Sequence, residues 1–250
     1  MKKIKIHPSF FIFIILAFVV GLQKELLLVL ISFLVHEIGH YFIIKIFKMN
    51  INSIDVYPFG GILIYENKND FIYKGLLISL GGVIFNFIFY LIALLLGFHS
   101  LMFLNLFFIV INLLPLYPLD GGNITILFLS YFLPYKIARK IAFILSIVFT
   151  VLLSLLLINY LDSLFSWIFI SFIIFNSIKG LIYLDKEYEK LVLIKYLSPN
   201  YNFKKYKTKF WTNNLVDSLF HQRILEFDFS TFTVSEEEVL RKFYINKKRL

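Results

Sequence analysis

The chain has 250 residues, a formal net charge of +9 and no cysteine. Hydrophobic residues make up 59% of it and charged residues 16%, whereas a soluble domain has about 45–50% and about 25%. This composition disfavours a water-soluble globular protein and favours a chain embedded in a lipid bilayer. The missing cysteines exclude disulfides, thiolate metal sites and cysteine nucleophiles. We interpret the positive charge as lysines that flank membrane spans, not as a surface that binds nucleic acid directly.

Apolar segments predict an all-α polytopic membrane protein with six transmembrane helices. The first segment follows three lysines and lacks a small-residue cleavage site, so we interpret it as a retained span and not as a signal peptide. The stretch Gly75–Leu119 has no charged residue and is too long for one span of about 20 residues, so we divide it near Gly97. Besides the two parts of that stretch, the predicted spans are about Phe10–Leu22, Leu26–Phe47, Ile141–Ile158 and Ser163–Tyr183.

A β-hairpin is predicted between the second and third spans. Residues 51–66 are rich in β-branched and aromatic side chains, and Pro58, Gly60 and Gly61 lie at their centre. That pattern is typical of two short strands around a turn and not of a helix.

Basic residues cluster before the first span and after the second, fourth and sixth spans, so both termini are predicted to be cytoplasmic. We therefore expect a multi-pass membrane domain over residues 1–184. Residues 185–250 contain no run long enough to span and are predicted to form a small cytoplasmic tail.

An H-E-x-x-H motif, His36-Glu37-Ile38-Gly39-His40, lies within the second predicted span. On a helix, positions i and i+4 project from one face, so two imidazoles can chelate one metal ion while the glutamate between them acts as general base. Ionisable groups in the bilayer interior are costly, which makes a chance match a poor explanation. Gly39 leaves room for another helix to approach closely.

Asp120 is the predicted third metal ligand. It is the one acid next to the long uncharged stretch, in Asn112-Leu-Leu-Pro-Leu-Tyr-Pro-Leu-Asp-Gly-Gly122, where prolines and glycines unwind the fourth span. Zinc hydrolases use three protein ligands and keep a fourth position for water. A helix cap is the alternative role for Asp120. His40 lies five residues before Lys45, about 7.5 Å along a helix, so the H-E-x-x-H motif lies toward the predicted cytoplasmic face. Asp120 lies near the cytoplasmic end of the fourth predicted span, so the two motifs can meet.

At these motifs the sequence resembles the site-2 protease family of intramembrane zinc metalloproteases, and its compact layout resembles the sporulation branch of that family. The resemblance implies one Zn²⁺ per chain, held by His36, His40 and Asp120, with Glu37 as the catalytic glutamate. It implies that Asn112 helps to hold substrate near the zinc.

Two further segments carry a weaker resemblance. Ser79 to Asn86 matches a family motif usually written with a Gly-Pro pair, but Val83 stands in place of the proline. Asn86 is therefore either a substrate-binding residue or a polar contact between helices. Residues 51–66, with Gly60 and Gly61, match a membrane-dipping β-loop that could present an edge strand to an extended substrate; an ordinary interfacial hairpin is the alternative.

The resemblance also implies a biological role. The expected substrate is a membrane-associated sigma-factor precursor processed during sporulation, in the membrane around the forespore, with inhibitory membrane partners. Anti-sigma factors or signal-peptide remnants are alternative substrates. A non-catalytic metal-binding membrane protein or transporter is the alternative of another class. Members of this branch often carry a nucleotide-sensing CBS-type domain, and residues 185–250 show no clear signature of it, so a divergent or truncated CBS-like regulatory domain is one interpretation of the tail.

Overall fold

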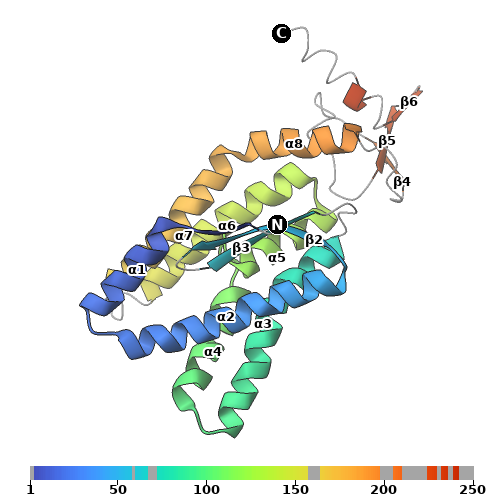
Figure 1. The fold of residues 1–250 in the computed structure, drawn as a ribbon. Coiled ribbons are helices and arrows are strands. Elements are labelled where there is room, and N and C mark those ends of the chain that lie inside the picture. The colour runs from blue at the N-terminus through green and yellow to red at the C-terminus, as the bar shows by residue number, and fades with distance from the viewer. Residues whose placement is uncertain are drawn as a thin grey trace.

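The computed structural model describes residues 3–57, 60–66, 72–156, 164–197, 205–209, 224–229, 232–235 and 239–241, and most of these are helical. In the first part of the chain, β1 (Lys3–Ile6) and α1 (Pro8–Val19) lead into α2 (Gln23–Ile46). Then β2 (Asn50–Tyr57) and β3 (Gly60–Glu66) precede α3 (Ile72–Leu95). Figure 1 shows α2 and α3 crossing near the middle of the molecule.

The predicted division near Gly97 is confirmed. Gly97 adopts a φ of +73°, a left-handed conformation that favours glycine after a helix end, and it separates α3 from α4 (His99–Leu113). Figure 1 shows α3 and α4 side by side as a hairpin that extends away from the tail, and the two helices pack against each other.

The predicted break in the fourth span is also present. Helix α4 ends at Leu113, and α5 (Asp120–Phe132) begins only after six residues that include Pro115 and Pro118. Proline cannot donate a backbone hydrogen bond and disfavours helix at the residue before it, which explains why the helix stops here. The break leaves Asp120 as the first residue of a new helix.

Within the described ranges three helices follow α5, and the first two lie in the predicted membrane domain. They are α6 (Tyr135–Leu156), α7 (Leu164–Ile182) and α8 (Leu184–Leu197). Phe143 of α6 is fully buried, and its ring lies over Gly180 of α7, where a Cβ atom would come within 2.6 Å of it. Leu184, at the start of α8, joins the same apolar cluster. Asp185 and Glu187, the first acidic residues of the predicted tail, pair with Lys136 and Arg139 of α6, so the first part of the tail packs on the membrane domain.

A three-stranded sheet of order β1-β2-β3 lies beside these helices. Strands β2 and β3 pair antiparallel, from Asn50 with Glu66 to Tyr57 with Gly60, as expected of the hairpin. The residues at its turn, 58–59, lie outside the described part, and its association with the membrane stays a prediction. The parallel pairing of β1 with β2 was not predicted.

The tail contains a second small sheet, which Figure 1 shows beyond the far end of α8. It has the order β4-β5-β6, with strands β4 (Lys205–Lys209), β5 (Ile224–Phe229) and β6 (Phe232–Ser235). Strand β4 runs parallel to β5, and β6 runs antiparallel to it. These strands leave the CBS-like interpretation of the tail untested.

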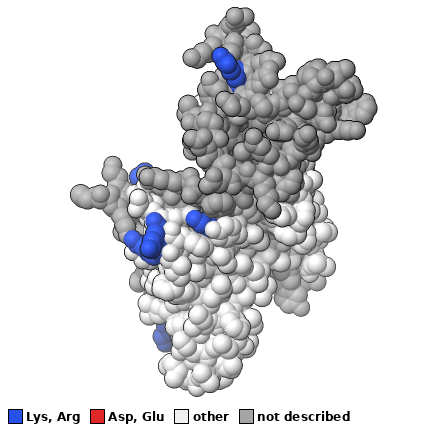
Figure 2. All heavy atoms as spheres, turned by 90° about the vertical axis from the view of Figure 1, so that its right-hand side faces the viewer, with Lys and Arg blue, Asp and Glu red and all other residues white. Residues whose placement is uncertain are grey.

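Three of the described helices, α2, α3 and α6, are long and apolar enough to cross a membrane by length and composition. Their 22 to 24 residues correspond to about 33–36 Å, compared with a hydrocarbon core of about 30 Å. Shorter apolar helices lie in α1, α4 and α7, so the six-span layout stays a prediction. In Figure 2 the described surface of one face is almost entirely uncharged, with a few Lys and Arg patches, which suits contact with lipid.

Candidate metal centre

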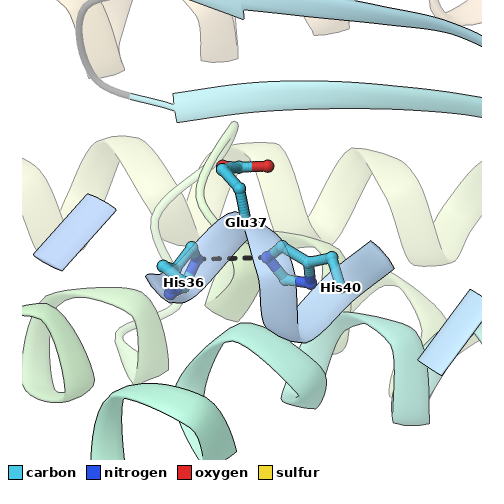
Figure 3. A group of neighbouring side chains, drawn as sticks. All are labelled: His36, Glu37 and His40. Atoms are coloured by element: carbon cyan, nitrogen blue, oxygen red, sulfur yellow. Dashed lines mark hydrogen bonds between the residues drawn. The ribbon is translucent and has the colours of Figure 1, made fainter. Parts of the chain in front are cut away.

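Two histidines on one face of α2 form the centre of the candidate site. His36 and His40 are one helical turn apart and buried, at 5% and 7% relative exposure. Their Nε2 atoms lie 3.1 Å apart, and Figure 3 shows the two rings next to each other. The prediction that the two imidazoles of the H-E-x-x-H motif point to a common position is therefore confirmed.

Asp120 reaches the same position from α5. Its Oδ2 atom lies 3.0 Å from His36 Nε2 and 3.2 Å from His40 Nε2. The two glycines that follow it make this possible, because a Cβ atom at Gly121 would collide with the Leu114 carbonyl and one at Gly122 would lie 2.6 Å from the Tyr117 backbone. The loop can therefore fold back tightly over the start of α5 and direct the carboxylate at the histidines.

Hydrogen bonds fix the orientation of both imidazoles. The Nδ1 atom of His40 lies 2.7 Å from the Ile78 carbonyl oxygen, which can only accept, so Nδ1 carries the proton. The Nδ1 atom of His36 lies 2.7 Å from Asn86 Oδ1 and donates to it in the same way. In a neutral imidazole the other nitrogen is then an acceptor, so both Nε2 atoms present lone pairs to the shared position.

Three acceptors therefore converge on one buried point. With neutral imidazoles, neither Nε2 can donate to the Asp120 carboxylate, and Asp120 Oδ2 is a buried atom that receives no hydrogen bond. Acceptors about 3 Å apart repel one another unless a cation lies between them. Zn²⁺ with bonds of about 2.0–2.1 Å in a tetrahedron would separate its ligand atoms by about 3.3 Å. The observed separations of 3.0–3.2 Å and the N, N, O donor set fit this ion.

Glu37 lies near the histidines but outside the close triangle. A carboxylate oxygen of Glu37 and one nitrogen of each imidazole lie within 4.8 Å of one another, compared with 3.2 Å or less for Asp120. Figure 3 shows the Glu37 side chain projecting away from the two rings, toward the side on which the strands lie in that view. The geometry thus favours Asp120 as the third ligand and leaves Glu37 for a proton-transfer role.

Glycines on α3 bring that helix against the motif. A Cβ atom on Gly39 would collide with the Gly81 carbonyl, so the backbones of α2 and α3 are in contact there, as predicted for Gly39. A Cβ atom on Gly82 would lie 2.5 Å from His36 Cε1 and 2.6 Å from His40 Nε2. Gly82 is therefore the wall of the candidate metal site on the α3 side.

The other predicted site residues are placed differently. Asn86 contacts His36 directly and is thus a polar contact between α2 and α3, whereas its predicted role in substrate binding stays a prediction. Asn112 is buried and donates to the Phe108 carbonyl within its own helix. Gly60 and Gly61 occupy the start of β3, opposite Tyr57 and Val56. Asn105 and Ser32 were not predicted, although Asn105 lies seven residues before Asn112 and Ser32 four before His36, on the same helix faces.

Two buried serines hold the loop that precedes Asp120. The Tyr117 backbone N–H donates to Ser146 Oγ of α6 at 2.8 Å, and Ser177 Oγ of α7 lies 2.9 Å from Ser146 Oγ. Ser177 also donates to the Tyr117 carbonyl at 3.3 Å. The interrupted backbone thus donates a hydrogen bond to α6 and accepts one from α7 in place of helical partners.

The exchange Ser146→Ala is expected to lower the stability of the protein. The Tyr117 N–H would lose its partner in an apolar setting, which costs about 1–3 kcal/mol. Thermal unfolding in detergent measures this loss. Ser154→Ala is the matched control, because Ser154 lies on the same helix and donates only to the Thr150 carbonyl one turn earlier in the described contacts. Equal melting temperatures for the two variants would contradict the expected role of Ser146.

Comparisons with known proteins found a family and several relatives that this chain resembles. Residues 24–101, which include the H-E-x-x-H motif, match peptidase family M50. The chain is 30% identical over 138 residues to stage IV sporulation protein FB of Bacillus subtilis, a match that covers 51% of this chain and 48% of that protein. It is 28% identical over 141 residues to a zinc metalloprotease of Methanocaldococcus jannaschii, covering 48% and 41%. The chain thus spans about half the length of the curated relatives it matches.

The fold is also similar to that of a solved structure. The site-2 protease from Methanocaldococcus jannaschii superposes with a TM-score of 0.57 at 22% identity, over 70% of this chain and 89% of that one. At this identity the likeness concerns the fold alone. The apolar helices and the family match together identify an integral membrane protein. These likenesses show that the chain is a homologue of stage IV sporulation protein FB and that its motif-bearing segment belongs to peptidase family M50, the family of the site-2 proteases.

Proposed function

We propose that this protein is a zinc-dependent membrane endopeptidase that hydrolyses peptide bonds within or beside the bilayer. The observation that carries the proposal is the buried triangle of His36 Nε2, His40 Nε2 and Asp120 Oδ2, with separations of 3.0–3.2 Å and a second carboxylate, Glu37, beside it. This set matches the ligands and the base that a zinc hydrolase requires. The apolar helices around it support chemistry within or beside the membrane.

Each residue has a distinct role in the proposed reaction. His36, His40 and Asp120 would hold one Zn²⁺, which when bound polarises the scissile carbonyl and makes a water molecule acidic enough to attack at neutral pH. Glu37 takes the proton from the attacking water and then delivers it to the leaving amine nitrogen. The Nδ1 partners of the two histidines keep the imidazoles aimed at the shared position while the proton moves.

Substrate binding is proposed to use the hairpin and α4. Strand β2 is flanked by β1 and β3, so strand addition by an extended peptide would take place at the outer edge of β3, where Gly60 and Gly61 lie. Asn112 is proposed to help hold the substrate near the metal. A peptide must be extended to expose its scissile bond, and pairing with an edge strand provides that conformation.

The expected substrate is a membrane-associated sigma-factor precursor that is processed during sporulation, in line with the similarity to stage IV sporulation protein FB. Under this proposal both termini face the cytoplasm, and in a spore former the protein lies in the membrane around the forespore with inhibitory membrane partners. Anti-sigma factors and signal-peptide remnants are alternative substrates.

The proposal is tested with the full chain reconstituted in lipid vesicles. Tethered sigma-factor precursors, anti-sigma factors and signal-peptide remnants are offered separately, with and without a zinc chelator. Cleavage that stops on chelation and returns with Zn²⁺ supports the endopeptidase, and the preferred substrate decides between the alternatives. Metal flux across the vesicles without proteolysis would instead indicate a transporter and overturn the proposal.

The exchange Asp120→Asn is expected to weaken zinc binding by about 10²-fold or more, because a neutral amide replaces the anionic oxygen and each tenfold step corresponds to about 1.4 kcal/mol. Competition with a chromophoric chelator measures the affinity. Asn123→Asp is a useful counterpart, because it places a carboxylate one turn further along α5 without changing the three ligands. Unchanged zinc affinity in Asp120→Asn would rule out Asp120 as the third ligand.

A further inference from the structure

A buried polar network connects the candidate metal centre to α4. His36 of α2 contacts Asn86 of α3, Asn86 contacts Asn105 of α4, and Asn105 returns to Ser32 of α2. The side chains of Ser32, Asn86 and Asn105 are fully buried, at 0% exposure. Such a network in apolar helices is costly unless its members are satisfied, and here the hydrogen bonds form a closed arrangement.

Two backbone carbonyls determine how both amides are oriented. The Asn86 amide end that points away from His36 lies 3.1 Å from the Ser32 carbonyl oxygen, so this end must be the NH₂ group. The Asn105 end that lies 2.8 Å from the Leu101 carbonyl oxygen must be NH₂ for the same reason. The Oδ1 atom of Asn105 is therefore left to accept from Asn86 Nδ2, at 2.7 Å.

The consequence of this arrangement reaches His36. Because the NH₂ group of Asn86 is used by Ser32 and Asn105, its Oδ1 atom faces the imidazole and accepts from Nδ1–H. A flipped Asn86 would place its oxygen against two acceptors and its NH₂ group against Nδ1–H. The network thus selects the tautomer of His36 whose Nε2 lone pair faces His40 and Asp120.

We propose that Asn105, with Ser32, is a positioning residue of the metal centre that acts through Asn86 to hold His36 in its metal-binding tautomer and orientation. The proposal rests on the proposed function and extends it to residues that touch neither metal nor substrate. Partners of metal-binding histidines typically change metal affinity by about 10–100-fold when they are removed.

The test compares zinc affinities of full-length variants in detergent by chelator competition. Asn105→Leu is expected to bind zinc about 10-fold or more weakly than the wild type. Asn176→Leu is the matched control, because Asn176 is a membrane-domain asparagine whose NH₂ group donates to the Phe172 carbonyl of its own helix. This control is expected to bind zinc with an affinity within about threefold of the wild type, a smaller change than the loss of one hydrogen bond typically causes.

Two further measurements separate positioning from simple packing. Because Asn105 acts through Asn86, the double variant Asn86→Leu/Asn105→Leu is expected to bind zinc no more weakly than Asn86→Leu alone. In zinc-free protein labelled with ¹⁵N-histidine, the His36 resonances are expected to show the Nδ1–H tautomer in the wild type and a mixture in Asn105→Leu. If Asn105→Leu fails to fold, Ser32→Ala is used in its place. It removes the hydroxyl that accepts from Asn105 and is expected to lower zinc affinity about fivefold.

The outcomes distinguish this inference from the proposed function. A wild type that does not bind zinc overturns the proposed function. A wild type that binds zinc, with Asn105→Leu and Ser32→Ala at wild-type affinity, overturns the positioning role alone. Fully additive losses in the double variant, or an unchanged His36 tautomer in Asn105→Leu, would likewise contradict it.

Discussion

Replacing Glu37 with glutamine is expected to lower peptide cleavage by about 10²–10⁴-fold while zinc remains bound, because general acid–base catalysis contributes a factor of that size. Glutamine has nearly the same shape as glutamate but cannot take up a proton. Glu37 lies outside the triangle of 3.0–3.2 Å formed by the two histidines and Asp120, so the metal ligands are retained. The measurement is the cleavage rate of a tethered substrate in vesicles, together with zinc content.

The zinc content of the Glu37→Gln variant is the internal control of this experiment. Equal zinc in variant and wild type assigns the loss of rate to proton transfer and not to a missing metal. Wild-type cleavage by a zinc-loaded Glu37→Gln protein would exclude Glu37 as the general base. Loss of zinc in this variant would instead indicate that Glu37 is a ligand and that the assignment of Asp120 needs revision.

The exchange Gly82→Ala is expected to disrupt the metal centre and to abolish both zinc binding and cleavage. An added Cβ atom would lie 2.5 Å from His36 Cε1, 2.6 Å from His40 Nε2 and 2.7 Å from His36 Nδ1, which is closer than real Cβ contacts. The rings cannot move away without losing the hydrogen bonds that orient them, to Asn86 and to the Ile78 carbonyl. Zinc content and cleavage are measured together on the purified protein.

Gly75→Ala provides the matched control, because Gly75 lies on the same helix two turns earlier. Its added Cβ atom would meet only the end of the Leu127 side chain, at 2.9 Å, and such a flexible group can rotate away. This control is expected to keep zinc and activity. A Gly82→Ala protein that binds zinc with wild-type affinity would show that the histidines do not occupy the observed positions in the metal-loaded protein.

The main parts of the site were predictable from local patterns. The i, i+4 spacing of His36 and His40 fixes a common face of a helix, and the structure keeps that geometry. The approach of Asp120 followed from the prolines and glycines around it, which interrupt the helix at a depth compatible with the histidines. The helix end at Gly97 and the strands around Pro58 were likewise predictable, because turn residues interrupt the hydrophobic pattern within a few positions of their own place in the chain.

Features that depend on distant parts of the chain were not predictable. Strand β1 pairs in parallel with β2, although α1 and α2 lie between them in the sequence. The four residues of β1 contain no signal for a partner about 50 positions away. Asn105 and Ser32 were missed for the same reason: a polar residue in an apolar helix shows that some partner exists but not which helix supplies it. Local patterning also could not decide whether the helices shorter than a bilayer, such as α4, span it.

The separation of the ligands along the chain has a consequence for how the protein is made. His36, Glu37 and His40 enter the membrane with α2, whereas Asp120 is synthesised 80 residues after His40. Until α3 and α4 have followed, the polar groups of α2 lack Asn86 and Asn105, and such groups raise the cost of inserting a helix. We therefore expect metal loading to be a late event of biogenesis, and nascent chains that end before Asp120 to reach the membrane without retaining zinc.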